Sequence, residues 1–355
     1  MKIGVLTFQT TTNYGACLQC MALTNKIISL GAQCETIFYK CSNIEKRELH
    51  NSIFISGIKN APKHFVSNIS RDIKARKINL FMKENTPLSQ IKYDRKSIGT
   101  SNSKYDLFIS GSDIIWELNV TGDDYTYYLD FVSDNLKKYS YSSSFGYDMV
   151  PIEKKETVSK LLSQYQMISV REIQGTEIIK NLIQKDVPVT ADPTLLYPDS
   201  FWLKYEKSYR MKRKPFVLLY FDDMEHKAMR FAKEIAEKNG ATVLYLTENF
   251  RRYDGVINIR NVSVGQFLWL IHNALCVVTG SYHGVLFSIN YNTPFYYINR
   301  AHKSRIETIV NILDIKNRDI SRNVSGLYDL DWSSINERLD TFRATSEQYL
   351  CNIIS

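Results

Sequence analysis

The sequence predicts an α/β protein made of two Rossmann-like domains that face a cleft. Short apolar runs alternate with helical segments along most of the 355 residues, a pattern typical of parallel sheets covered by helices. The alternation is interrupted at residues 197–214, which contain Pro198 and the basic run Lys212-Arg213-Lys214. Since a chain of this length has room for two domains of roughly 100–200 residues each, we expect the interruption to be the linker.

We expect the first domain at residues 1–196, the linker at 197–214, the second domain at 215–330 and an amphipathic helix in the tail, 331–355. In the first domain the expected strands are 3–8, 34–39, 105–110, 138–145, 167–170 and 187–190, and the expected helices are 16–30, 151–163 and 172–183. In the second domain the expected strands are 216–221, 242–246, 275–279 and 295–298, and the expected helices are 224–238, 264–273, 284–290 and 305–313.

The charge of the chain favours an anionic partner. The formal net charge is +8, which suits nucleic acid, acidic lipid or a phosphorylated substrate. No motif of a nucleic-acid module is present, so we expect no nucleic acid as a partner. The basic residues concentrate in a helical insertion at about residues 45–84, interleaved with apolar ones. Two interpretations stay open there: solvated helices, or docking on an anionic membrane surface.

The apolar runs and the cysteines indicate in which compartment of the cell we expect the protein. No run approaches the about 20 apolar residues of a membrane span, so we expect a cytoplasmic protein, with peripheral attachment to the inner face of the plasma membrane under the second interpretation. The six cysteines form no disulfide framework, which fits a reducing compartment. Cys17 and Cys20 make a C-x-x-C inside an apolar helical run without a second pair. We interpret them as buried thiols rather than a metal or redox site.

The strongest local signal for chemistry is the segment Thr279-Gly280-Ser281-Tyr282-His283-Gly284, between a predicted strand and a predicted helix. Ser281 is a suitable N-cap, and glycines allow a ligand to approach the backbone closely. A helix start offers N–H groups and partial positive charge to phosphate or carboxylate. His283 beside such an anion would be a general acid. The alternative is a buried structural histidine.

Further basic residues also follow predicted strands. Arg171 comes directly after the strand 167–170, and its planar fork can grip phosphate or carboxylate. Glu172 could orient it or cap the next helix, and the alternative is a surface Arg–Glu pair. Lys303 and Arg305 follow the strand 295–298 and offer another anion contact.

Two turns of the first domain are candidates for substrate binding: Asn13-Tyr14-Gly15-Ala16 and Gly111-Ser112-Asp113. Turn formation alone explains them almost as well. Asp113 is the only carboxylate in either turn, which makes it a candidate general base for an acceptor hydroxyl. The chain has no G-x-G-x-x-G, Walker A, H-E-x-x-H or G-x-S-x-G motif. The Asp329-Leu330-Asp331 triplet lies in the tail, so we expect no metal and no bound cofactor.

Taken in order, these segments resemble the polysaccharide pyruvyl transferase family. The resemblance spans roughly residues 3–312. The ordered set of matching segments is more specific than any single segment. The matching stretches are 3–8, Asn13-Tyr14-Gly15-Ala16, Gly111-Ser112-Asp113 with Trp116, Tyr141-Ser142-Ser143-Ser144-Phe145-Gly146, Ser169-Val170-Arg171-Glu172, Ala191-Asp192-Pro193-Thr194-Leu195-Leu196, Ser281-Tyr282-His283-Gly284 with Phe287-Ser288-Ile289, and Ser304-Arg305-Ile306.

The resemblance implies a GT-B-like fold whose C-terminal helix crosses back to the first domain. It implies phosphoenolpyruvate as co-substrate, a lipid-linked or nucleotide-linked saccharide as acceptor, and a pyruvate ketal and phosphate as products. It assigns donor contacts to Arg171, His283 and a later basic residue, for which we choose Arg305 over Lys303. The other predicted substrate-binding residues are Asn13, Tyr14, Gly15, Gly111, Ser112, Ser144, Gly280, Ser281, Tyr282 and Lys303.

The sequence departs from the family at one position. Some members carry an arginine two residues before the histidine, and here Ser281 stands there. Their phosphate contacts therefore cannot be carried over whole. Two alternatives stay open: a nucleotide-sugar glycosyltransferase of the same two-domain shape, and a catalytically silent scaffold of polysaccharide assembly.

Overall fold

The computed structural model describes residues 1–9, 11–49, 61–211, 215–221, 225–248, 250–299, 304–322, 324 and 329–355, with the side chains of 48, 49, 61–69 and 316 left aside. The chain divides into two compact units. Unit 1 comprises Met1–His50, Asn79–Leu196 and Asp340–Ser355, and unit 2 comprises Asn51–Ile78 and Tyr197–Leu339. The division between 196 and 197 lies where the linker was expected to begin. Each unit is described by itself.

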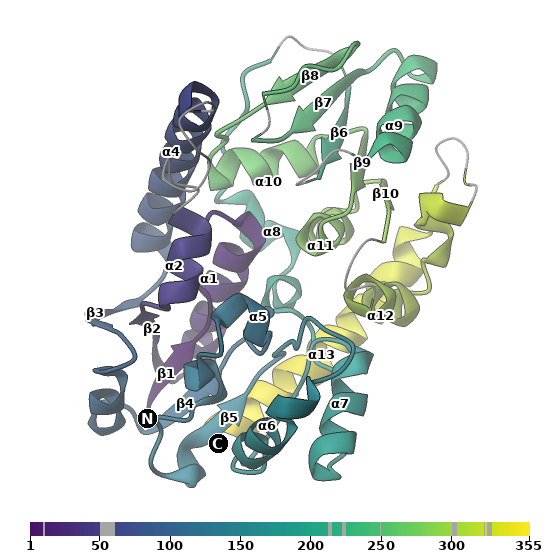
Figure 1. Cartoon of the computed structure of the whole chain (residues 1–355). Helices are drawn as coiled ribbons and strands as arrows, with labels where there is room; N and C mark the ends of the chain where they lie inside the picture. The colour runs from purple at the N-terminus through teal and green to yellow at the C-terminus, as the bar shows by residue number, and fades with distance from the viewer. Residues whose placement is uncertain are drawn as a thin grey trace. The chain divides into compact units, whose positions relative to one another are not determined.

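Unit 1 contains a five-stranded parallel sheet in the order β3-β2-β1-β4-β5 (Figure 1). This is the Rossmann order, 3-2-1-4-5. Beyond β5, isolated bridges join Ser143 to Asp113, Ser143 to Val170 and Val170 to Val189. The strands are β1 (Lys2–Leu6), β2 (Gln33–Tyr39), β3 (Leu88–Tyr93), β4 (Leu107–Ser110) and β5 (Lys138–Ser140).

The helices of unit 1 cover this sheet. The apolar helix α1 (Tyr14–Ser29) buries most of its length, from Tyr14 to Thr24. Around Trp116, which is fully buried, the rings of Tyr128 and Phe145 pack at centroid distances of 5.4 and 5.0 Å. The other helices are α2 (Ser42–Leu49), α5 (Leu118–Thr121), α6 (Lys155–Leu162) and α7 (Ile173–Ile183), with 3-10 turns at Ile98–Ser103, Tyr125–Tyr128, Asn135–Lys137, Ile152–Lys154 and Pro193–Leu196.

Two long helices contribute residues to both units. The helix α4 (Ala61–Asn85) begins in unit 2 and ends in unit 1, and α13 (Trp332–Ile354) does the same. In unit 1, α13 is anchored by Tyr349, whose hydroxyl donates to the Ser140 carbonyl at 3.1 Å. Ser346 Oγ accepts from the backbone N–H of Ala191 at 2.8 Å. The last turns of α13 therefore hold the segment that follows Val189.

Unit 2 repeats the same topology. Its parallel sheet has the order β10-β9-β6-β7-β8. Read from β8 to β10, with the strands numbered from the first strand of this unit, the order is again 3-2-1-4-5. The strands are β6 (Phe216–Tyr220), β7 (Thr242–Leu246), β8 (Val256–Ile259), β9 (Cys276–Thr279) and β10 (Phe295–Tyr297). The helices are α8 (Asp199–Leu203), α9 (His226–Lys238), α10 (Val264–His272), α11 (Tyr282–Asn290) and α12 (Ser304–Leu313), with 3-10 turns at Lys316–Arg318 and Ile320–Arg322.

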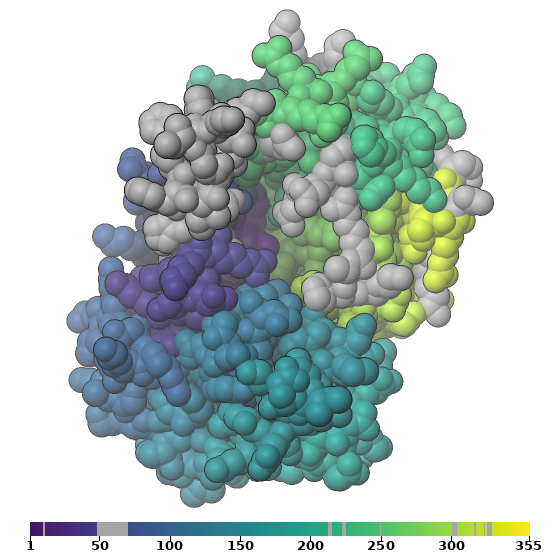
Figure 2. Space-filling model, viewed as in Figure 1, coloured from purple at the N-terminus to yellow at the C-terminus, as the bar shows by residue number. Residues whose placement is uncertain are grey.

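The predicted fold class, two Rossmann-like α/β sheets, is confirmed. The expected strand 138–145 is shorter, because Ser142 has φ 50° and leaves the extended conformation. The expected strands 167–170 and 187–190 are present only as isolated bridges. The strands β3 and β8 were not predicted. On the face shown in Figure 2, α2 in purple and the segment after β3 in blue and teal form the surface of unit 1.

Candidate functional site

The strand order of each unit defines where a ligand should bind. In an open parallel sheet, ligands bind beyond the carboxyl ends of the strands, at the point where the strand order reverses. That point lies between β1 and β4 in unit 1 and between β6 and β9 in unit 2. Gly111-Ser112-Asp113 directly follows β4, and Gly280-Ser281 with His283 directly follows β9. Both of these predicted segments therefore lie at such a point.

Asp113 has an unusual backbone conformation in the turn after β4. Its φ is 81°, a region that L-residues other than asparagine and aspartate rarely adopt. Its side chain is nearly buried, with a residue exposure of 7%. Oδ1 accepts a hydrogen bond from the Ile114 N–H at 2.8 Å. Conformations of this kind cluster at functional sites, which is consistent with the predicted role of Asp113.

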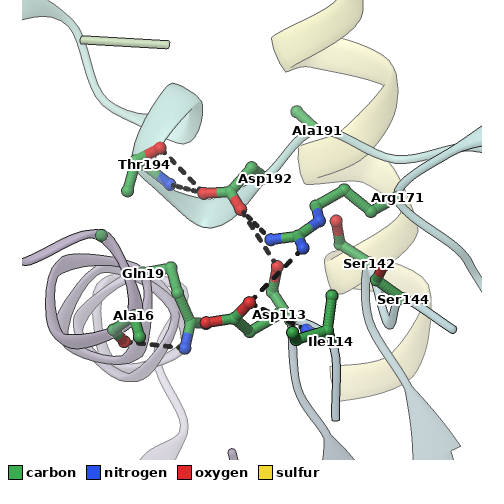
Figure 3. Close-up of polar contacts among 12 residues, drawn as sticks. Ala16, Gln19, Asp113, Ile114, Ser142, Ser144, Arg171, Ala191, Asp192 and Thr194 are labelled. Atoms are coloured by element: carbon green, nitrogen blue, oxygen red, sulfur yellow. Dashed lines mark hydrogen bonds and ion pairs between the residues drawn. The ribbon is translucent and has the colours of Figure 1, made fainter. Parts of the chain in front are cut away.

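Arg171 is fully buried and paired with two carboxylates, as Figure 3 shows. Nη1 donates to Asp192 Oδ2 at 2.9 Å, and Nη2 lies 3.5 Å from Asp113 Oδ1. Glu172 instead accepts from Ser144 Oγ at 2.8 Å and from the Phe145 N–H at 3.2 Å. A surface Arg–Glu pair does not describe this geometry. The predicted donor contact of Arg171 stays a prediction.

Asp192 connects the predicted residues, although the sequence assigned it no role. Its Oδ2 accepts from Ser112 Oγ at 3.2 Å as well as from Arg171. Its Oδ1 accepts from the N–H and the hydroxyl of Thr194 at 3.0 and 2.8 Å. Charge-assisted hydrogen bonds of this kind are the strong ones. The sequence held a signal for it, because Asp192 follows a predicted strand at the same sheet edge.

A second chain of hydrogen bonds reaches the same turn from α1. Thr7 Oγ1 donates to the Ser112 carbonyl at 2.7 Å and accepts from Gln19 Nε2 at 2.9 Å. Gln19 Nε2 also donates to the Ala16 carbonyl at 2.9 Å. In Figure 3 the Gln19 side chain points toward Asp113. Sequence reasoning missed Gln19, because it stands in an otherwise apolar helical run.

The Asn13-Tyr14-Gly15 turn begins α1. Asn13 is the N-cap, and its Oδ1 accepts from the N–H groups of Gly15 and Ala16, while Tyr14 is fully buried. Helix capping therefore accounts for Asn13, and its substrate-binding role stays a prediction. Further along α1, Cys17 and Cys20 are fully buried, as expected. Burial raises the pKa of the Cys20 thiol to about 12, which keeps it protonated at neutral pH.

In unit 2 the predicted N-cap is confirmed: Ser281 Oγ accepts from the Gly284 N–H at 3.3 Å, at the start of α11. His283 is buried at 6% exposure, and its ring lies edge-on to that of Tyr282. A Cβ at Gly284 would lie 2.7 Å from Thr279 Oγ1. Only glycine fits there, so this position packs the helix start against β9.

Arg305 lies close to the same helix start. Its guanidinium carbon is 6.0 Å from the centroid of the Tyr282 ring, over its face. The structure thus places Tyr282, His283 and Arg305 around the beginning of α11. Lys303 lies outside the described residues. Within the ranges that the structure describes, no group of three His, Cys, Asp or Glu side chains could hold a metal ion.

A family model described as polysaccharide pyruvyl transferase matches residues 13–302. The chain belongs to this family. The match covers both turns, Arg171 and His283, in one stretch. No curated protein matches the sequence of this family member at a significant level.

The solved structures that the chain is similar to share little sequence with it. A UDP-N-acetylglucosamine 2-epimerase from Methanocaldococcus jannaschii is 11% identical with a TM-score of 0.47, over 100% of this chain and 99% of that one. A putative epimerase of the same name from Listeria monocytogenes is 11% identical with a TM-score of 0.47, over 98% and 97%. The glycosyltransferase SsfS6 from Streptomyces sp. SF2575 is 11% identical with a TM-score of 0.40, over 100% of both chains.

Proposed function

We propose that this pyruvyl transferase family member moves the enolpyruvyl group of phosphoenolpyruvate onto a saccharide, forming a pyruvate ketal and releasing phosphate. The observation that carries the proposal is the grouping of His283 and Arg305 at the start of α11, beyond the carboxyl end of β9. A helix start and a guanidinium both attract phosphate and carboxylate. Phosphoenolpyruvate carries both groups.

The proposed chemistry assigns a proton to each step. His283 protonates the methylene carbon of the donor, which becomes a methyl group while cationic character builds at C2. A first saccharide hydroxyl bonds to C2 and gives up its proton, for which Asp113 is the proposed base. The bond between C2 and the phosphate oxygen then breaks, a second hydroxyl bonds to C2 in its place, and the proton of that hydroxyl goes to the departing phosphate. Fixed cations stabilise the departing phosphate. The reaction as proposed uses no cofactor besides phosphoenolpyruvate as co-substrate.

Arg305 provides a test of donor binding. We expect Arg305→Gln to raise the Kd for phosphoenolpyruvate about tenfold or more, because a hydrogen bond to a charged group contributes about 1.5–3 kcal/mol. Isothermal titration of the full chain measures this. The control is Arg230→Gln on α9, an exposed arginine of the same unit, whose Kd should match wild type.

Two results would contradict the proposed function. One is a wild-type protein that UDP- or GDP-sugars stabilise against heat and phosphoenolpyruvate does not, which would favour the glycosyltransferase alternative. The other is the absence of phosphate release from phosphoenolpyruvate with every lipid-linked or nucleotide-linked saccharide tried, which would favour the silent scaffold.

We also propose that the acceptor is lipid-linked and that α4 brings the chain to an anionic membrane surface. None of the described helices is long and apolar enough to cross a bilayer. Two lysines of α4 have protein partners: Lys74 pairs with Glu248, and Lys77 donates to the Asn261 carbonyl. One face of the helix does expose apolar and basic residues at helical spacing, which suits an interfacial helix: Ile73, Arg76, Leu80 and Lys83.

Charge reversal on that face tests membrane docking. We expect R76E/K83E to weaken sedimentation with phosphatidylserine vesicles at least about tenfold, since each basic residue near such a surface contributes about 1 kcal/mol. The matched control, R230E/K238E, makes the same charge change at exposed positions of α9. Equal binding of wild type to neutral and anionic vesicles, or none, would leave the solvated-helix interpretation.

A further inference from the structure

Two networks of hydrogen bonds, here called braces, meet at the turn that carries Asp113. One passes through the Asp192 carboxylate and the other through the Gln19 amide. We propose that Asp192 and Gln19 are positioning residues for the Asp113 carboxylate. The inference rests on the proposed pyruvyl transfer, in which Asp113 takes the proton of an acceptor hydroxyl. All of these residues belong to unit 1.

The first brace runs through Asp192. Its carboxylate accepts four hydrogen bonds, two on Oδ2 from Arg171 and Ser112 and two on Oδ1 from Thr194. The residue before it, Ala191, is held in turn by Ser346 of α13 at 2.8 Å. These hydrogen bonds satisfy the Asp192 carboxylate and fix its position. Asp192 in turn holds the Arg171 guanidinium beside Asp113 and the side chain of Ser112, the residue before Asp113.

The second brace runs from α1 through Thr7 to the Ser112 carbonyl. The orientation of the Gln19 amide is determined, because a carbonyl oxygen only accepts hydrogen bonds, so the amide group that faces the Ala16 carbonyl must be Nε2. Gln19 Oε1 is then left buried, with no hydrogen-bond partner among the residues that the structure describes. An unsatisfied buried acceptor is unfavourable, and an apolar side chain would avoid it. The two hydrogen bonds that Nε2 donates, to Thr7 and Ala16, therefore explain why an amide rather than an apolar side chain stands at position 19.

Asp113 needs such support. Its φ of 81° is unfavourable for an L-residue, so the turn would relax if the surrounding contacts were removed. Its carboxylate accepts one short hydrogen bond, from Ile114, and a longer contact from Arg171 at 3.5 Å. It is less satisfied than Asp192 and keeps a small exposed fraction. Of the two carboxylates, Asp113 is therefore the one able to take a proton while the hydroxyl oxygen bonds to C2.

The charges support the same division of roles. One guanidinium faces two carboxylates, at 2.9 and 3.5 Å. The shorter distance is to Asp192, so Asp113 is the carboxylate that the guanidinium holds less closely.

The test uses Asp192→Asn and Gln19→Met in the full chain. Asparagine at position 192 has a single acceptor oxygen, so its NH2 group must face donors, either those of Arg171 and Ser112 or those of Thr194. Methionine at 19 removes both donated hydrogen bonds at similar volume. We expect kcat to fall about 10- to 100-fold, since a shift of about 1 Å can cost 10²-fold. The Kd for phosphoenolpyruvate should stay within about threefold, and amide exchange of the 111–116 segment should accelerate.

The control is Thr24→Val, which removes a 2.6 Å hydrogen bond between two fully buried hydroxyls of unit 1. It should lower stability without changing kcat. A normal kcat in Gln19→Met, or unchanged exchange at 111–116 in both variants, would overturn the positioning role. If wild type releases no phosphate, the proposed function fails as well, which separates the two cases.

Discussion

His283→Gln should reduce kcat at least about 100-fold, the lower range for a lost acid–base group. Glutamine keeps hydrogen bonding and approximate size but cannot supply a proton to the methylene carbon of the donor. Histidine suits that task because its ordinary pKa of about 6.5 lies near neutral pH. The Kd for phosphoenolpyruvate should change far less, since Arg305 and the start of α11 remain. Steady-state phosphate release and isothermal titration measure the two quantities.

His272→Gln is the matched control for this experiment. His272 lies in the same unit, pairs with Glu206 at 3.0 Å and stacks on Tyr291, so the same substitution there should leave kcat within about twofold of wild type. A His283→Gln enzyme with normal turnover would exclude the role of general acid. Joint loss of affinity and turnover would make His283 a donor ligand, and the acid would have to be another group.

Most of the strands that the sequence predicted well consist almost entirely of buried residues. The run Thr242–Leu246 is apolar almost throughout and forms β7 within the predicted bounds. In contrast, β3 and β8 are edge strands, and each has residues that are only partly buried. An edge strand needs less apolar surface, so Leu88–Tyr93 and Val256–Ile259 carry little of the pattern by which strands are recognised.

The candidate site residues were chosen where the chain leaves a predicted strand. That rule found Asp113, Arg171 and His283, because the carboxyl ends of parallel strands meet at one edge. It gave no indication that the Arg171 guanidinium is paired with two carboxylates. It also missed Gln19, whose contact with Thr7 joins α1 to the loop after β1. Such contacts depend on tertiary packing, which periodicity does not encode.

Arg171→Met should destabilise unit 1 by about 3–5 kcal/mol, because removing one partner of a buried ion pair leaves buried charge uncompensated. The guanidinium has no exposed surface, and its partners Asp192 and Asp113 are 0% and 10% exposed in their side chains. At about 2–4 °C per kcal/mol for a unit of this size, the Tm of its unfolding transition should fall by about 6–20 °C. Calorimetry of the full chain measures it.

A surface ion pair is the control for this experiment, because it separates the effect of losing an ion pair from the effect of leaving charge buried. Arg95 pairs with Asp130 through two hydrogen bonds of 2.7 and 2.5 Å, but its side chain is 55% exposed. Arg95→Met should therefore cost at most about 1 kcal/mol. The double variant R171M/D192N should be less destabilised than the sum of its single variants, because it removes one of the uncompensated carboxylates. Equal Tm values for Arg171→Met and Arg95→Met would show that the buried carboxylates do not need the guanidinium, and the brace around Asp113 would lose its physical basis.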